Sequence, residues 1–386
     1  MLDGELGEAK ALAMKLVAAL GDVFGAKRTV RVKSVQISGV SYKTIGDHGL
    51  EFVVDLRDKG GKFSVPSTIN PAGMDLENWR RMGIPEWFAK KQLRIISALK
   101  DMGARVTCTC TPYLVGNKPK FGDHVAWAES SAVVFANSVL GARTNREGAP
   151  SSLASAIVGR TAMYGMHLKP ERSPTHLVKV ETRIRNELEF SLLGYVIGEK
   201  VAKGVPFIFK FKGNCTSDNL KALGAGMATS GSIALFHLEE RTPEAKKIGE
   251  KKLKGLEKIS IEERDIEEVK GRLGAEGPST HVFLGCPHLS LRELKAIASI
   301  LKGKELKEKI WCFTSRKIYG SAVKLGYVKE IEEAGGVVVK DTCMVVCPLE
   351  RLGISNVRVN SAKAAYYLSS LSGLKPRLCS LKEIGG

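Results

Sequence analysis

The chain has 386 residues, 44% of them hydrophobic, which is enough to bury the cores of two or three domains. It contains no apolar run near the ~20 residues that a membrane-spanning helix needs, and its N-terminus shows no apolar signal core. These features argue against a membrane protein and a secreted protein, and we expect a cytoplasmic location.

The formal net charge is +18, from 59 basic and 41 acidic side chains. Such an excess suits nucleic-acid binding, attraction of an anionic substrate, or the charge-rich surface of a thermophilic protein. Basic and acidic residues are interspersed along the chain, and only 6% of the residues are aromatic. Because a clustered basic footprint is missing, nucleic acid is an unfavoured partner, and the charge remains compatible with a small anion.

Hydrophobic spacing in the first part of the chain alternates between the helical period and the strand period. Pro85 opens one of the helices, and a glycine-rich turn and an Asn-Pro loop follow two of the strands. The expected elements are, in chain order, a helix at 5–24, strands at 29–38 and 62–68, a helix at 85–102, a strand at 105–109 and a buried helix at 126–140.

The middle of the chain is expected to form a smaller unit. Residues 205–240 show a strand–helix–strand pattern, and residues 241–272 are dense in charge, as in an exposed surface that carries helices. We therefore divide the chain into an N-terminal α/β region at 1–204, a small α/β insert at 205–275 and a C-terminal α/β region at 276–386.

The C-terminal region has the clearest pattern. An apolar strand at 281–284 runs into Gly-Cys-Pro-His, and Ser290 then opens a helix with Glu293 in the capping-box position. Strands at 310–313 and 336–340, with a helix between them, continue the alternation. Strands that alternate with helices indicate a parallel sheet, so the fold class is α/β. Ligands of such sheets bind beyond the carboxyl ends of the strands.

Cysteines follow the ends of three predicted strands, at Cys108 and Cys110, at Cys286 and at Cys343. A cysteine is often no more than a small buried hydrophobe. If these strand ends converge, however, three thiolates can hold an iron–sulfur cluster. With three ligands in place of four, one iron stays open and can act as a Lewis acid on a bound hydroxyl. The spacing alone leaves both interpretations open.

Several long segments resemble the aconitase X family, in the order in which the family has them, and the resemblance extends over nearly the whole chain. The segments are SGVSYKTIGDHGLEF (38–52), NPAGMDLENW (70–79), CTCTPYLVGN (108–117), HVAWAESSAVVFANSVLGARTNREG (124–148), GCPHLSL (285–291) and NSAKAAYY (360–367). The resemblance implies a multi-domain aconitase-like fold, with parallel-sheet α/β domains around a central cluster site and without the swivel domain of aconitases. It also implies a hydro-lyase that removes water from a small anionic hydroxy acid.

For the cofactor, the resemblance implies a [4Fe-4S] cluster with Cys110, Cys286 and Cys343 as its ligands and one iron that the protein does not ligate. Cys108 is the alternative to Cys110, and Cys347 is the alternative to Cys343. A strand would direct Cys108 and Cys110 to opposite faces, so only one of them is expected to reach the cluster.

The matching segments also carry over the substrate-binding positions, which are Gly39, Val40, Ser41, Asn70, Pro71, Glu129, Ser130 and Lys363. The residues themselves leave plainer roles open: a tight turn for Gly39, a helix cap for Glu129 and a solvated surface cation for Lys363. Arg143 and Arg146 are further candidates, as clamps for an anion.

In split members of the family, the swivel domain that supplies a serine base is a separate small subunit. The resemblance therefore implies that this chain is the large subunit of a heterodimer or of a dimer of heterodimers, with the base on the partner. Archaeal members dehydrate mevalonate 5-phosphate, and bacterial relatives dehydrate hydroxyprolines. The string NREG and the charge-rich composition favour the archaeal substrate. A hydroxyproline dehydratase and a cluster-free, RNA-binding protein are the alternatives.

Overall fold

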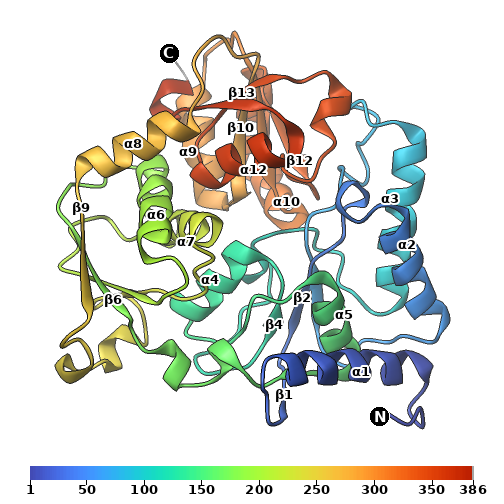
Figure 1. Cartoon of the computed structure of the whole chain (residues 1–386). Helices are drawn as coiled ribbons and strands as arrows, with labels where there is room; N and C mark the ends of the chain where they lie inside the picture. Colours follow the sequence, from blue (N-terminus) through green and yellow to red (C-terminus); the bar gives the residue numbers. More distant parts are fainter. Residues whose placement is uncertain (385–386) are drawn as a thin grey trace.

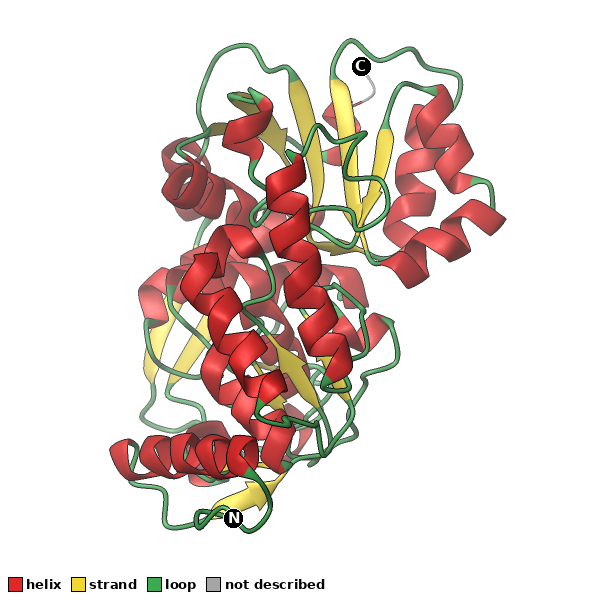
Figure 2. Ribbon diagram, turned by 90° about the vertical axis from the view of Figure 1, so that its right-hand side faces the viewer, coloured by secondary structure: helices red, strands yellow, loops and turns green. Residues whose placement is uncertain are grey.

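The computed structural model describes residues 1–384 and consists of three α/β units (Figure 1). In Figure 1 the N-terminal unit lies at the lower right, the middle unit at the left and the C-terminal unit at the top. Figure 2, a quarter turn away, shows the C-terminal sheet at the opposite end of the molecule from the N-terminal helix. No helix among the described residues is long and apolar enough to cross a membrane. The predicted α/β class is confirmed.

The N-terminal unit contains a parallel three-stranded sheet and the helices that cover it. Its elements are α1 (Glu8–Val23), β1 (Thr29–Arg31), β2 (Val35–Ile37), α2 (Tyr42–Asp58), β3 (Ser67–Ile69), α3 (Glu86–Asp101), β4 (Ala126–Trp127), α4 (Ser130–Ser138), α5 (Ala149–Val158) and β5 (Arg160–Ala162). The strand order is β3-β2-β4, while β1 and β5 form a separate antiparallel pair. The central strand β2 is buried at every residue, which explains why its ends are the apolar Val35 and Ile37.

The middle unit is a parallel four-stranded sheet with two long buried helices. Its elements are β6 (His176–Val180), α6 (Glu187–Val201), β7 (Pro206–Phe209), α7 (Ser217–Ser230), β8 (His237–Leu238), β9 (Glu257–Ile261) and α8 (Glu263–Leu273), with the strand order β8-β7-β6-β9. Helices α6 and α7 approach closely because a glycine lies at their contact: a Cβ on Gly194 would be 2.1 Å from the carbonyl oxygen of Leu223. The boundary that the sequence suggests, between residues 204 and 205, falls between α6 and β7 inside this unit.

The C-terminal unit is a five-stranded sheet in which all neighbouring strands are parallel. Its elements are β10 (His281–Leu289), α9 (Leu291–Leu301), β11 (Lys309–Thr314), α10 (Arg316–Lys324), α11 (Tyr327–Glu333), β12 (Val337–Lys340), β13 (Asn356–Val359), α12 (Ala362–Ser372) and β14 (Lys375–Leu378), with the order β12-β11-β10-β13-β14. The predicted capping box is confirmed: the Ser290 hydroxyl accepts from the Glu293 N–H, and the Glu293 carboxylate accepts from the Ser290 N–H.

Several segments differ from the expected elements. The strand expected at 29–38 is two short strands, β1 and β2, in different sheets, and the strand expected at 62–68 is limited to β3 at Ser67–Ile69. Residues 105–109 form no strand, because only Arg105 bridges Thr68 and because Cys108 has a left-handed φ of 41°, which turns the chain out of extended geometry. The apolar stretch 126–140 is not one helix either. It begins as β4, paired with β2, and becomes α4 at Ser130.

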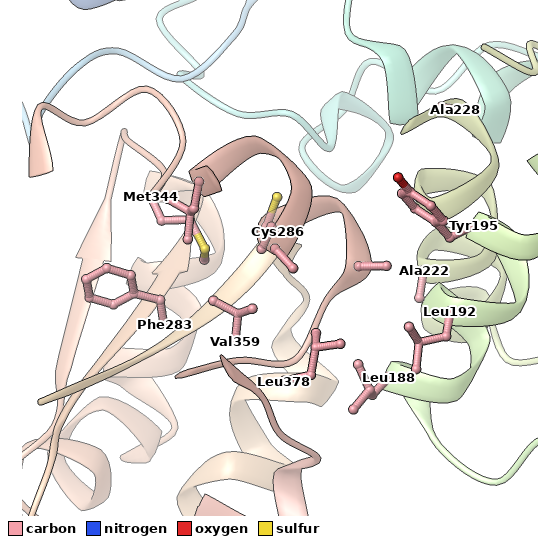
Figure 3. Packing of buried hydrophobic residues seen from close by; sticks show 14 of the residues in the cluster. Leu188, Leu192, Tyr195, Ala222, Ala228, Phe283, Cys286, Met344, Val359 and Leu378 are labelled. Atoms are coloured by element: carbon pink, nitrogen blue, oxygen red, sulfur yellow. The ribbon is translucent and has the colours of Figure 1, made fainter. Parts of the chain in front are cut away.

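A hydrophobic cluster joins the middle and C-terminal units (Figure 3). It combines Leu188 of α6 and Ala222 of α7 with Phe283 of β10 and Val359 of β13. Because Cys286 of β10 belongs to the same cluster, this packing fixes the strand that carries Cys286 against the two helices of the middle unit.

Candidate active site

One cavity of about 230 Å³ lies where loops of the N-terminal and C-terminal units meet, beyond the carboxyl ends of β2, β3 and β4. The eight substrate-binding positions and the three cluster ligands that the resemblance implies all line it: Gly39, Val40, Ser41, Asn70, Pro71, Glu129, Ser130, Lys363, Cys110, Cys286 and Cys343. The remaining lining residues are Ser38, Thr44, Ala128, Gly285, Val345, Val346, Tyr367 and Leu371. Since pockets for drug-sized ligands run to ~300–1,000 Å³, this cavity suits a smaller molecule.

The cysteines divide into those that face the cavity and those that do not. Cys110, Cys286 and Cys343 line it and keep 6%, 7% and 7% of their surface exposed. Their neighbours in sequence, Cys108 and Cys347, are fully buried in hydrophobic clusters away from the cavity lining. One cysteine of each close pair therefore reaches the cavity.

All eight cysteines are free thiols. Burial raises the pKa of Cys286 to about 12 and raises the pKa of Cys110 and Cys343, while the nearby Lys363 cation opposes each shift. Among residues 1–384, no three His, Cys, Asp or Glu side chains are arranged to hold a single metal ion. Three thiols spread around one cavity therefore fit a larger, polynuclear group better than a zinc-type site.

The Lys363 ammonium and the Glu129 carboxylate form a buried ion pair at the cavity, with Nζ 2.6 Å from Oε1. Lys363 also donates to the hydroxyls of Ser130, at 3.4 Å, and Ser131, at 3.3 Å. The Asn70 amide donates to the other carboxylate oxygen of Glu129 at 3.0 Å. Burial acts to raise the pKa of Glu129, but the Lys363 charge and hydrogen bond outweigh it, so the pKa is lowered and both partners are ionised.

These contacts exclude two of the plainer roles. Glu129 stands at the N-cap of α4 but makes no side-chain cap hydrogen bond, because its carboxylate is directed to Lys363 and Asn70. Lys363 is only 7% exposed, so it is not a solvated surface cation.

Three helix N-termini converge on the cavity, those of α2, α4 and α12. The turn before α2 requires glycine at Gly39, where φ is 71° and a Cβ would lie 2.6 Å from the Cβ of Ala149. Ser41 caps α2 by accepting from the Lys43 N–H at 3.2 Å, and its hydroxyl donates to the Val346 carbonyl at 2.9 Å. The partial positive charge of three helix ends makes the cavity attractive to an anion.

Sequence reasoning missed Gln36 and Tyr367. Gln36 is fully buried in β2, and its amide N–H groups donate to the Asn70 side-chain oxygen at 2.6 Å and to the Thr109 carbonyl at 2.7 Å. The pattern in the sequence that could have indicated Gln36 is a polar side chain between the apolar Val35 and Ile37 of a short strand. Tyr367 lies four residues after Lys363 on α12, so helical spacing places the two side chains on one face.

The two arginines considered as anion clamps, Arg143 and Arg146, lie outside the cavity lining. Arg143 donates to the backbone carbonyl of His167 at 3.1 Å, and Arg146 is exposed. The loop that holds them pairs with the residues before α4, through isolated bridges of Arg143 with His124 and of Arg146 with Trp127.

Comparisons with known proteins indicate one family over nearly the whole chain. Three aconitase X family models match in succession: the first domain at residues 1–170, the second at 174–271 and the third at 279–385. The phosphomevalonate dehydratase large subunit of Methanocaldococcus jannaschii is 50% identical over 377 residues, which cover 96% of this chain and 93% of that protein. The cis-3-hydroxy-L-proline dehydratase of Hypocrea jecorina is 34% identical over 385 residues, which cover 96% of this chain and 64% of that protein.

Among solved structures, the holo-form of Thermococcus kodakaraensis aconitase X is similar over 100% of this chain and 97% of its own, with a TM-score of 0.92 and 42% identity. This similarity confirms the multi-domain fold that the sequence segments imply. The chain therefore belongs to the aconitase X family.

Proposed function

We propose that this chain is the large subunit of a phosphomevalonate dehydratase, which removes water from (R)-mevalonate 5-phosphate to give trans-anhydromevalonate 5-phosphate in isoprenoid synthesis. The observation that carries the proposal is the cavity, where three cysteines, a buried lysine and three helix N-termini converge. The similarity to a large subunit of this enzyme, at 50% identity over 96% of the chain, supports the choice of substrate.

The donor set fits an iron–sulfur cluster, and Cys110, Cys286 and Cys343 are the residues that would hold it. Such a cluster, of the [4Fe-4S] type, would supply one iron without a protein ligand as a Lewis acid for the substrate's tertiary hydroxyl. Because burial raises the pKa of all three thiols, they release protons when they become ligands, and the Lys363 cation favours that release. We also propose a cytoplasmic location, where a reducing environment keeps all eight cysteines as free thiols.

The chain's own residues bind and orient the substrate. The N-termini of α2, α4 and α12 direct partial positive charge into the cavity, which favours a carboxylate or a phosphate. Lys363 adds a full positive charge, and its bonds to Glu129 and Ser131 fix the ammonium at the cavity wall. The cavity walls are mostly buried, and a subunit that covered the open side would exclude bulk water from the reacting carbon atoms.

The base that removes the proton next to the carboxylate is assigned to a small subunit. Among the described residues that line the cavity, the Glu129 carboxylate is ion-paired with Lys363, the Ser41 hydroxyl donates a hydrogen bond to the Val346 carbonyl, and the Ser130 hydroxyl accepts one from Lys363. Each of these groups is already engaged within the chain, which favours a base from a second chain. The relative from Methanocaldococcus jannaschii is named a large subunit, which supports a second chain. Leu371, 55% exposed at the cavity, is an apolar edge that this subunit would cover.

The test is to purify the chain anaerobically with the small subunit and to offer mevalonate 5-phosphate and cis-3-hydroxyproline separately. We expect dehydration of the phosphate compound alone. The alternative, a hydroxyproline dehydratase, is favoured by the more distant Hypocrea jecorina relative, and turnover of hydroxyproline alone would establish it. Turnover of neither compound by the cluster-loaded complex would contradict both assignments.

A further inference from the structure

His288 is a fully buried residue that joins all three units of the fold. It lies in β10, two residues after Cys286. Its side chain and its backbone make four hydrogen bonds, which reach Thr109 and Cys110 of the N-terminal unit, Lys221 of the middle unit and Thr342 of the C-terminal unit.

The imidazole ring connects the two other cysteine loops. Nε2 lies 2.8 Å from the carbonyl oxygen of Thr342, which can only accept, so Nε2 carries the proton. Nδ1 lies 2.9 Å from the Thr109 hydroxyl and therefore accepts from it in the neutral ring. Thr109 immediately precedes Cys110, and Thr342 immediately precedes Cys343. One ring thus fixes the distance between the backbones that carry two of the three thiols.

The backbone of His288 makes the other two connections. Its N–H donates to the sulfur of Cys110 at 3.2 Å, and its carbonyl accepts from the Lys221 ammonium at 3.1 Å. Lys221 is buried on α7 and is ion-paired with Glu293 and with Asp218. Glu293 closes the capping box of the helix that follows β10. The peptide groups of His288 are therefore held from both sides.

We propose that His288 is a positioning residue that holds the three cysteine-bearing segments in one arrangement and directs a backbone hydrogen bond to the Cys110 sulfur. The proposal rests on the proposed function, in which Cys110, Cys286 and Cys343 hold an iron–sulfur cluster. Groups behind metal ligands orient those ligands, and hydrogen bonds to cluster sulfurs tune the cluster. His288 itself is not a ligand, since both ring nitrogens are occupied by Thr109 and Thr342.

Substitutions can separate this role from a purely structural one. His288→Asn keeps a hydrogen-bond acceptor near the position of Nδ1, which contacts Thr109. His288→Gln keeps a donor near the position of Nε2, which contacts Thr342. Thr109→Val removes the hydroxyl at nearly constant shape, and Thr109→Ser restores it. His281→Gln, on the same strand but outside the cavity lining, is the matched control.

The experiment measures the rate at which cluster absorbance is lost in air, the electron-spin spectrum of the reduced cluster, and the unfolding temperature of the cluster-free chain. We expect His288→Asn, His288→Gln and Thr109→Val to lose the cluster about 10-fold or more faster than wild type, with an altered spectrum. Thr109→Ser and His281→Gln should behave as wild type. If the His288 variants fail to fold, the Thr109 pair decides.

The proposal would be overturned if Thr109→Val and both His288 variants kept the wild-type cluster lifetime and spectrum. It would also be overturned if Thr109→Ser lost the cluster as fast as Thr109→Val. A wild-type chain that holds a cluster but dehydrates neither substrate refutes the proposed function while these comparisons still decide the role of His288. A wild-type chain that takes up no cluster overturns both.

Discussion

The two close cysteine pairs, Cys108 with Cys110 and Cys343 with Cys347, reach the same outcome by different routes. In each pair one thiol faces the cavity and the other is fully buried in the core. In the first pair, the left-handed φ of 41° at Cys108 turns the chain between the two residues. In the second, the Cys347 N–H bonds to the Cys343 carbonyl at 3.0 Å and closes a single turn.

The difference shows that spacing does not decide which cysteine faces the site. Two residues apart in a strand would face opposite sides, and four residues apart in a helix would face the same side. Neither segment is a regular helix or strand. Hydrogen bonds from other parts of the chain therefore determine which thiol of each pair faces the cavity. Gln36 holds the Thr109 carbonyl at 2.7 Å, and the Lys43 ammonium holds the Cys347 carbonyl at 3.1 Å.

The largest expected effect comes from replacing the cysteines one at a time by alanine. Cys110→Ala, Cys286→Ala and Cys343→Ala should abolish both the full cluster and dehydration, because each removes a proposed ligand. Cys108→Ala and Cys347→Ala should keep the cluster and lose about 1 kcal/mol of stability through a small cavity. Iron and sulfide analysis, with urea unfolding of the cluster-free chain, measures both quantities.

The distinction between cavity-facing and buried cysteines would be contradicted if Cys108→Ala or Cys347→Ala lost the cluster while folding normally. It would also be contradicted if Cys110→Ala, Cys286→Ala or Cys343→Ala kept a full complement of iron and sulfide.

The ion pair at the cavity gives the next effect. Lys363→Met leaves the buried Glu129 carboxylate unpaired and should cost about 3–5 kcal/mol, whereas the double variant with Glu129→Gln should cost clearly less than the sum of the two single variants. Dehydration should be lost in Lys363→Met and in the double variant, since both lack the cation proposed to meet the substrate anion. Urea unfolding and activity assays check this, and additive stability losses would argue against the pair.

The thiols should also differ in reactivity. In the cluster-free chain we expect iodoacetamide to label Cys110, Cys286 and Cys343 before Cys108 and Cys347, because only the first three are partly exposed. Burial raises the pKa of Cys286 to about 12, so its thiolate fraction and labelling rate should keep rising from about pH 8 to 11. Mass spectrometry of labelled peptides measures both. A plateau near pH 9 for Cys286 would contradict the buried environment.

The smallest effect concerns the anchor of the first pair. Gln36→Leu removes the donor to Asn70 and to the Thr109 carbonyl and should cost about 1–3 kcal/mol, because both acceptors are left unpaired. The first cysteine loop should loosen, so the cluster should be less stable in air than in wild type. Unfolding and cluster-loss measurements test this, and an unchanged stability would show that the anchor is dispensable.

Much of the fold followed from local patterns. The alternation of strands and helices after His281 gave the parallel C-terminal sheet, and Ser290 with Glu293 gave a helix start, because both are short-range signals. The strand expected at 105–109 was wrong, since a left-handed backbone at Cys108 depends on contacts far away in sequence.

The site was predicted through resemblance, and its residues do line one cavity, but their contacts could not be read from the sequence. The Lys363–Glu129 ion pair spans 234 positions, and no local rule connects them. Gln36 could not be assigned to the site, because alternation cannot show that both faces of β2 are covered. Arg143 and Arg146 were candidates because of their charge, and charge does not show where a side chain points; neither lines the cavity.

The most direct test of the central claim is Mössbauer spectroscopy of the ⁵⁷Fe-loaded complex, prepared anaerobically with the small subunit, before and after addition of mevalonate 5-phosphate. If Cys110, Cys286 and Cys343 hold a cluster with one iron left open, the substrate should shift the signal of a single iron and leave the others unchanged. A spectrum that stays the same for every iron, while the substrate is bound and converted, would contradict the account.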